Sequence, residues 1–203
     1  MVTNIYSDIL KQGTSKGYQY GDVELRDWFR DKALQLTSSQ TSINRTLNRQ
    51  GAKASTVPTA RIGRMLMYRY DPKHKATLPY YDKFPIIFPI EKYKDGWLGI
   101  NLHYLPPVYR ARLMDALYDL INNDQYDETT KLKISYKLLA NVAKTRYFRP
   151  CIKRYLFSHV KSSLVEIDPK EWDYCAFLPL ARFAKADQRK VWDDSIKMIQ
   201  AKR

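Results

Sequence analysis

The sequence predicts an α+β protein in which a small antiparallel, barrel-like sheet in the middle of the chain is flanked by an N-terminal helix and a C-terminal helical bundle. Two observations predict this class. Apolar residues alternate with a period of two in the centre of the chain, as they do in strands. On either side they recur every three or four residues, behind residues that cap helices. These changes of period divide the chain into an N-terminal helical segment (1–36), a basic polar arm or linker (37–60), a small antiparallel β-sheet region (61–105) and a mainly helical region packed on the sheet (106–203).

The first helix is predicted from Val23 to Leu36. Asp22 stands at its N-cap position, and Arg26 and Arg30, four residues apart, are expected to face solvent. The following residues, 37–60, are polar and contain almost no large apolar side chain. Such a composition is typical of a mobile arm or of a segment that orders on a partner.

The central region is predicted to form three strands. They cover residues 64–70, 84–90 and 98–104. The tripeptide Lys94-Asp95-Gly96 is a strong hairpin signal between the second strand and the third. Pro85 and Pro89 place the second strand at a sheet edge or at a bulge, because proline cannot donate a hydrogen bond to a neighbouring strand.

Four helices are predicted beyond the sheet. The first three are predicted because proline suits the first helical position and aspartate suits the N-cap, and the last, which ends at Ile199, is predicted from its apolar spacing. They begin at Pro107, behind Asp127, at Pro150 and at Asp187. The second of these helices is expected to run to Ala143 with Tyr136 on its buried side. In the third, Ile152 and Leu156 share one face, which leaves Lys153 on a different face, in solvent.

The sign of the charge is the strongest indication of function. The 203 residues include 35 Lys and Arg against 21 Asp and Glu, which gives a net charge of +14 and a pI near 9.7. From Lys131 to Lys161 there are nine Lys or Arg and no Asp or Glu. Such an excess is typical of a nucleic-acid-binding protein, although membrane surfaces and acidic proteins attract the same charge. No stretch reaches the roughly 20 apolar residues that span a bilayer, so no membrane partner is predicted.

Two basic clusters are predicted to contact DNA phosphates. One contains Arg45, Arg49, Lys53, Arg61 and Arg64, and the other contains Lys144, Arg146, Arg149, Lys153 and Arg154. Contacts of this kind read no base sequence and make the affinity strongly dependent on salt. The tyrosines of the central region, among them Tyr80, Tyr81 and Tyr104, are expected either to cover the core or to offer faces on which bases stack.

Motifs for catalysis are few. The chain has no glycine-rich phosphate loop, its three histidines have no metal spacing, and two cysteines are too few for a thiolate zinc site, so no metal or other cofactor is predicted. Cys151 is expected to be either a buried small residue or a thiol with a lowered pKa at a helix start. A metal-dependent nuclease is the weaker, enzymatic hypothesis, because several acids and a lysine could converge on a divalent ion. They are Asp82, Glu91, Glu166, Asp168 and Lys170.

Several strings of the sequence are similar to a known family. LPYYDKFP and GINLHYLPP in the centre, with RPCIKRYL and EWDYCAFLPLARF further on, resemble structural proteins of T-even-type tailed bacteriophages, a family associated with the label DNA end protector. The resemblance covers residues 60–185. It implies a minor virion protein without catalytic residues, which binds the ends of packaged double-stranded DNA and is present in the host cytoplasm during assembly.

A second hypothesis assigns the chain to the assembly of the head, neck, tail or baseplate. Its basic groups would then pair with acidic groups of other virion proteins, and the arm at 37–60 would order in a groove on a ring of subunits. The two hypotheses differ in the partner that the cations meet, since one requires DNA phosphates and the other requires carboxylates of neighbouring proteins.

Overall fold

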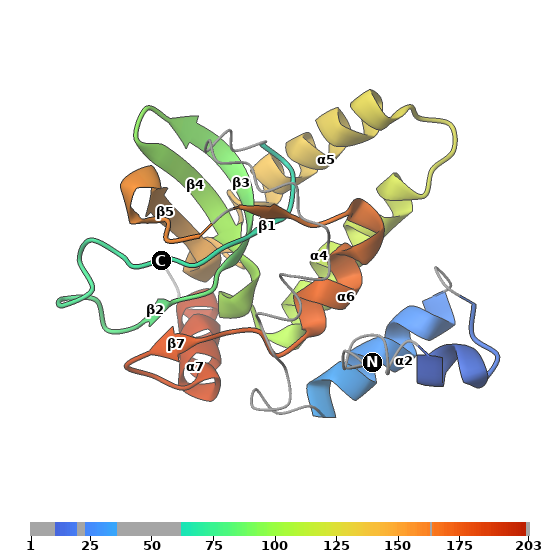
Figure 1. The fold of residues 1–203 in the computed structure, drawn as a ribbon, viewed down its shortest axis with the longest axis horizontal. Helices are drawn as coiled ribbons and strands as arrows, with labels where there is room; N and C mark the ends of the chain where they lie inside the picture. The colour runs from blue at the N-terminus through green and yellow to red at the C-terminus, as the bar shows by residue number, and fades with distance from the viewer. Residues whose placement is uncertain (1–10, 20–22, 36–61, 163, 202–203) are drawn as a thin grey trace.

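A five-stranded antiparallel sheet forms the centre of the fold (Figure 1). The structure is a computed structural model, and it describes residues 11–19, 23–35, 62–162 and 164–201. The mixture of helices with an antiparallel sheet confirms the predicted α+β class. The predicted arm at 37–60 lies outside the described residues.

The sheet takes strands from distant parts of the chain. They are β1 (Leu66–Met67), β3 (Ile86–Tyr93), β4 (Gly96–Asn101), β5 (Ile152–Leu156) and β6 (Val165–Glu166), and a separate ladder joins β2 (Tyr81–Asp82) to β7 (Phe183–Ala184). The order across the sheet is β5-β4-β3-β1-β6. Among the described strands β5 and β6 are edges that do not pair with each other, so the sheet is open. The predicted barrel-like closure is therefore wrong, because a barrel leaves no free edge.

The hairpin between β3 and β4 follows the local sequence. Tyr93 pairs with Gly96, so the turn falls where it is predicted. β3 lies inside the sheet, and the register shifts between Pro89 and Glu91, which means that the proline is accommodated by a bulge. A Cβ atom at Gly96 would collide with the backbone of Tyr155, so the close approach of β5 to β4 requires glycine there.

The helices end and begin largely at the predicted caps. They are α2 (Val23–Gln35), α4 (Pro107–Ile121), α5 (Glu128–Val142), α6 (Trp172–Phe177) and α7 (Gln188–Gln200), with 3₁₀ turns η1 (Leu102–Tyr104), η2 (Arg149–Cys151), η3 (Phe157–His159) and η4 (Pro169–Glu171). The Asp127 carboxylate accepts the Thr130 N–H, and the Asp187 carboxylate accepts the Lys190 N–H. None of the described helices is long and apolar enough to cross a membrane.

Two predictions for the C-terminal half are wrong. Pro150 opens no long helix, because only η2 forms there and the chain continues as β5. The pairing of Tyr155 with Trp97 in β4 buries both rings, and this burial outweighs the helical spacing of Ile152 and Leu156. Tyr136 of α5 is 39% exposed and does not lie on the buried side. The C-terminal half therefore adds β5, β6 and β7 to its helices, while the division of the chain into domains stays a prediction.

The sheet separates two apolar clusters, because alternate residues of a strand point to opposite faces. Met65 and Met67 belong to the larger cluster, which the helices cover. On the other face Tyr68 meets Trp97 edge to face with ring centroids 5.6 Å apart, and Trp97 Nε1 donates a hydrogen bond of 3.2 Å to the Tyr68 hydroxyl. Both rings are fully buried, so they build the core and present no face to a ligand.

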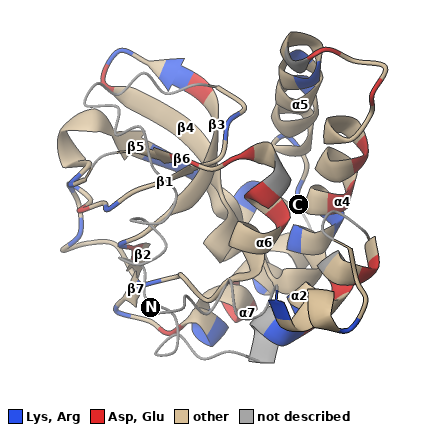
Figure 2. Cartoon of the chain, turned by 45° about the vertical axis from the view of Figure 1, so that its right-hand side comes forward, with Lys and Arg blue, Asp and Glu red and all other residues tan. Residues whose placement is uncertain are grey.

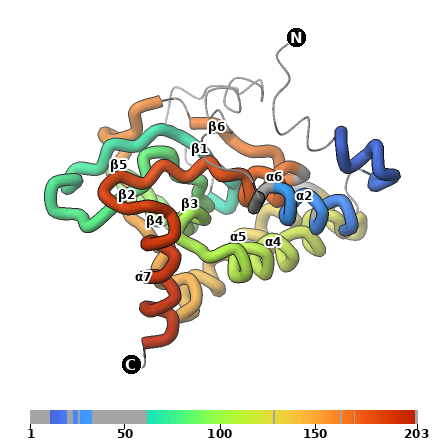
Figure 3. The backbone as a smooth tube through the Cα atoms, turned by 90° about the horizontal axis from the view of Figure 1, so that it is seen from below, coloured from blue at the N-terminus to red at the C-terminus, as the bar shows by residue number. Residues whose placement is uncertain are grey.

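The buried Arg30 joins α2 to α4 and α6, and these three helices lie beside one another in Figure 3. Arg30 is 8% exposed, in contrast to the prediction that it faces solvent. Its guanidinium forms an ion pair with Asp173 of α6 and donates a 2.9 Å hydrogen bond to Asp115 of α4. An arginine in the first helix is therefore a structural link, and it is not available to a partner.

Candidate functional site

Six of the ten residues that are predicted to contact DNA are described by the structure. Arg45, Arg49, Lys53 and Arg61 lie outside the described residues. Arg64, Lys144, Arg146, Arg149, Lys153 and Arg154 are described, and they occupy three different environments. Their contact with DNA stays a prediction, but their surroundings differ in how much charge they leave for a partner.

Lys144, Arg146 and Arg149 are exposed on the connection between α5 and β5. The Tyr147 ring stacks on Tyr109 of α4 with centroids 5.7 Å apart. Arg146 lies 5.0 Å from the centroid of the Tyr147 ring and donates a 3.2 Å hydrogen bond to its hydroxyl. This hydrogen bond, together with the positive charge of Arg146, lowers the pKa of Tyr147. Aromatic packing thus holds part of an exposed cationic segment in place.

Lys153 and Arg154 are separated from this segment because they belong to β5. The Lys153 ammonium lies 4.2 Å from the centroid of the Tyr104 ring, and burial lowers its pKa. The predicted solvated position of Lys153 is therefore wrong, because a strand turns this side chain onto an aromatic ring. Arg154 lies 4.2 Å from the centroid of the Tyr93 ring and forms an ion pair with Asp95. Both cations already have partners within the chain.

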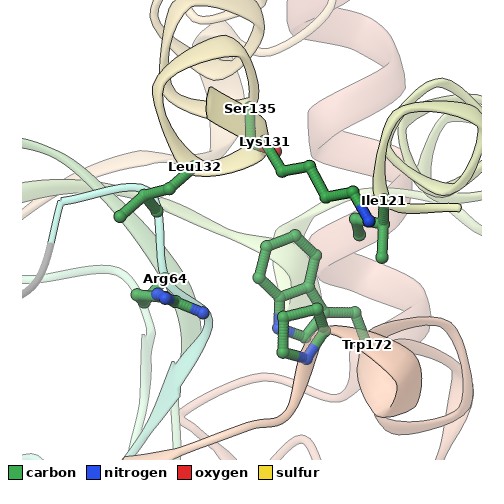
Figure 4. Close-up of a pocket in the computed structure, with 7 residues that line it drawn as sticks. Arg64, Ile121, Lys131, Leu132, Ser135 and Trp172 are labelled. Atoms are coloured by element: carbon green, nitrogen blue, oxygen red, sulfur yellow. The ribbon is translucent and has the colours of Figure 1, made fainter. Parts of the chain in front are cut away.

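Arg64 borders a small pocket around the Trp172 ring (Figure 4). Lys131 and Ser135 of α5 line the same pocket, whose volume is about 20 Å³. Such a volume holds about one water molecule, so the pocket excludes a nucleotide. Arg64 Nε also lies 3.6 Å from a carboxylate oxygen of Glu166 on β6. The surroundings of Arg64 are consequently those of a structural arginine between β6 and α5.

Asp82, the first acid of the nuclease hypothesis, is a buried structural carboxylate. His103 Nδ1 donates a 2.6 Å hydrogen bond to it, since an ionised carboxylate can only accept, and Asn101 donates another of 3.2 Å. Burial by itself would raise the pKa of Asp82, but attraction to His103 and the hydrogen bonds outweigh burial, so the pKa is lowered. Within the part of the chain that the structure describes, no group of three or more His, Cys, Asp and Glu is arranged to hold a metal ion.

The two cysteines are buried thiols. Burial raises the pKa of Cys175 to about 12 and also raises the pKa of Cys151 well above its ordinary value. Of the two expectations for Cys151, the buried small residue is confirmed and the reactive thiol with a lowered pKa is wrong.

A second pocket brings together cations that no motif in the sequence groups. Arg69, Lys83, Lys161 and Arg182 line an opening with a volume of about 520 Å³. These residues come from four distant parts of the chain, so no local motif or spacing could have grouped them. Only the way the strands and connections fold makes them neighbours.

The fold is thus an open α+β scaffold that carries exposed cations and a pocket lined by four basic residues. The chain belongs to the family of phage T4 terminal DNA protecting proteins, because the model of that family matches residues 23–195. This match confirms the resemblance to the DNA end protector family of T-even-type phages. No curated protein and no solved structure gives a match.

Proposed function

We propose that the chain is a non-enzymatic virion protein that binds the ends of packaged double-stranded DNA and shields them from exonucleases. Membership in a family of terminal DNA protecting proteins supports this function. The protein would shield a DNA end by occupying it, without cleaving any bond, so this role requires no catalytic group. Contacts with phosphates suit it, because they hold a duplex without reading its sequence.

The exposed connection after α5 carries the proposal. Lys144, Arg146 and Arg149 are exposed there, within a stretch from Lys131 to Lys161 that contains no Asp or Glu. A phosphate that approaches this segment meets cations without neighbouring carboxylates in the sequence, which is the arrangement that displaces counterions from DNA.

Binding to a short blunt DNA duplex tests the function. Six to ten phosphate contacts would lower the affinity by on the order of a thousandfold or more between low and moderate salt. Replacing Lys144, Arg146 and Arg149 together by glutamate is expected to weaken binding at least about tenfold and to reduce the salt dependence by about three released counterions.

A matched control keeps the change of charge and moves it elsewhere. Lys73, Lys92 and Lys94 are also exposed, and their replacement by glutamate should weaken binding clearly less. Fluorescence anisotropy across a salt series measures both variants. The proposal is wrong if the wild-type chain binds no duplex at low salt.

Exposed carboxylates on α2 and α4 favour a protein contact as a second function. Asp31 of α2 and Asp119 of α4 are exposed, and Figure 2 shows red segments beside blue ones along these helices. These two carboxylates would pair with cations of a head, neck or tail protein during assembly in the host cytoplasm. The variant Asp31→Lys/Asp119→Lys should then be lost from purified virions, and normal incorporation would remove this candidate.

A further inference from the structure

Four chain segments meet at the pocket of about 520 Å³, and each contributes one cation. The cations are Arg69, Lys83, Lys161 and Arg182. The Lys161 N–H donates to the Arg69 carbonyl at 2.8 Å, and the Lys83 N–H donates to the Arg182 carbonyl at 2.9 Å. The Tyr70 N–H donates to the Lys83 carbonyl at 3.0 Å and links the two pairs. Backbone pairing therefore sets the four cations side by side.

Positive charge dominates the pocket. Among the described residues that line it, Asp71 is the one acid, and each of its carboxylate oxygens lies 3.0 Å from the Lys75 ammonium. This hydrogen bond lowers the pKa of Asp71, so the carboxylate is ionised and already paired. For Lys83 and Lys161, which are exposed, the described chain contains no ion pair. The charges of Lys83 and Lys161 are thus left for an anion from outside.

The groups around the pocket are held in place before any ligand binds. Arg182 Nη1 donates to the carbonyls of Pro179 and Ala181 at 3.2 and 2.9 Å. The Lys185 ammonium donates to three carbonyls of the loop that follows Asp71, at 2.6, 2.8 and 2.9 Å. Because these groups are already ordered, binding of an anion loses less conformational entropy.

An aromatic ring lies next to the cations. Phe84 lines the pocket and is half-buried, and the Arg69 guanidinium lies 5.9 Å from the centroid of its ring. Nucleic-acid sites combine cations for phosphates with rings on which a base stacks. A volume of about 520 Å³ falls within the range of small-molecule sites, which suits one nucleotide.

From this geometry we propose that the pocket binds a phosphate group at the terminal nucleotide of a DNA strand. The inference rests on the proposed function and adds a site to it, because the connection after α5 would contact the flank of the duplex while the pocket holds its end. The phosphate is either the 5′-terminal monoester or the phosphodiester that follows it, and the same four cations would hold both.

Charge reversal in the full chain tests the site. The variant Lys83→Glu/Lys161→Glu is expected to bind a short blunt duplex at least about tenfold more weakly than the wild type. The control Lys92→Glu/Lys94→Glu makes the same change of charge in the exposed hairpin between β3 and β4, and it should cost clearly less affinity. Equal losses in the two variants would overturn the site while leaving the proposed function intact, whereas a wild type that binds no duplex would overturn the proposed function.

Three forms of the same duplex distinguish the two phosphates. They carry 5′-phosphates, 5′-hydroxyls, or hairpin loops that close both ends. A loss of affinity confined to the 5′-phosphorylated duplex assigns the pocket to the monoester, and an equal loss on the two open duplexes but not on the closed one assigns it to the adjoining phosphodiester. An equal loss on all three forms contradicts a site for the end.

Lysine acetylation of the wild-type chain tests the site without any substitution. Addition of the 5′-phosphorylated duplex should slow acetylation of Lys83 and Lys161 more than acetylation of Lys92 and Lys94. Equal protection of the two pairs would also overturn the proposal, and this holds even if a variant fails to fold.

Discussion

Two regions of the molecule place cations in opposite environments. In the helical region Arg30 is buried against Asp173, Asp115 and Asp27, and its guanidinium lies 5.0 Å from the centroid of the Phe177 ring. In the pocket beside β2 and β7 four cations face one acid, which Lys75 already pairs. The same residue types therefore serve the fold in one region, whereas in the other Lys83 and Lys161 form no ion pair within the described chain.

The difference shows that an excess of lysine and arginine does not locate a binding site. Arg64, Lys153 and Arg154 belong to predicted DNA-binding clusters, yet each contacts a carboxylate or a ring of the chain itself. A cation is free for a polyanion where neighbouring carboxylates are absent or already paired. The ratio of cations to available carboxylates in one region of the fold thus locates a binding site better than the number of cations along the sequence.

Removal of Arg30 should destabilise the helical region and have the largest effect. Arg30→Met leaves the buried Asp173 carboxylate without its partner, and such a loss costs about 3–5 kcal/mol of the free energy of unfolding. The double variant Arg30→Met/Asp173→Asn should recover a large part of this, because it removes the uncompensated charge as well. Urea denaturation measures both.

Arg112 of α4 provides the control, since it is exposed. Arg112→Met should change the free energy of unfolding by less than about 0.5 kcal/mol. If Arg30→Met were no more harmful than Arg112→Met, the ion pairs of Arg30 would not hold α2 on α4 and α6.

Acid should reduce the stability that the buried Asp82 carboxylate contributes, and this is the second-largest expected effect. The pKa of Asp82 is lowered in the folded chain, so the unfolded chain binds more protons in acid. The stability that ionised Asp82 gives the fold is complete above its pKa in the unfolded chain, about 4, and is lost as the pH falls through its pKa in the folded chain. Asp82→Asn should therefore lower the free energy of unfolding by about 1–3 kcal/mol at neutral pH and by less in acid.

The surface pair of Asp71 with Lys75 serves as the comparison for Asp82. Asp71→Asn should change stability little at any pH, because an exposed ion pair contributes little. Denaturation of both variants across a pH series measures the difference. A pH dependence of Asp82→Asn equal to that of the wild type would contradict the structural role of this carboxylate.

The smallest effect is expected at Lys185, which lies beside the pocket and binds a neighbouring loop. Lys185→Met removes three hydrogen bonds to the loop after Asp71 and should lower the local stability of that loop by about 1 kcal/mol. Hydrogen exchange of the Thr77 and Leu78 amides, which donate to the His74 carbonyl, should become faster. Lys73→Met lies in the same loop and should leave exchange unchanged; equal rates in both variants would show that the Lys185 ammonium does not order the loop.

The helices that the sequence predicts correctly are those with local capping signals. Pro107, Asp127 and Asp187 act on the first turn of their own helices, so a single-sequence pattern is sufficient to find them. The strand β5 could not be found in this way. Its conformation follows from pairing with β4, and the glycine that permits this pairing, Gly96, is more than fifty residues away along the chain.

The two candidate sites, the connection after α5 and the pocket, differ in the same way. Lys144, Arg146 and Arg149 are exposed after α5. They lie in a stretch of sequence without Asp or Glu, so the sequence alone is enough to single them out. The pocket is different, because Lys83 and Lys161 become neighbours only through the backbone pairing of their segments. Tertiary contacts of this kind leave no periodicity in the sequence.

Protection of a linear blunt duplex from an exonuclease tests whether the cationic pocket holds the DNA end. The wild-type chain and the hairpin control Lys92→Glu/Lys94→Glu should slow digestion, whereas Lys83→Glu/Lys161→Glu should leave the duplex nearly as sensitive as it is without protein. Undiminished protection by the Lys83→Glu/Lys161→Glu variant would contradict the claim that the cationic pocket holds the DNA end.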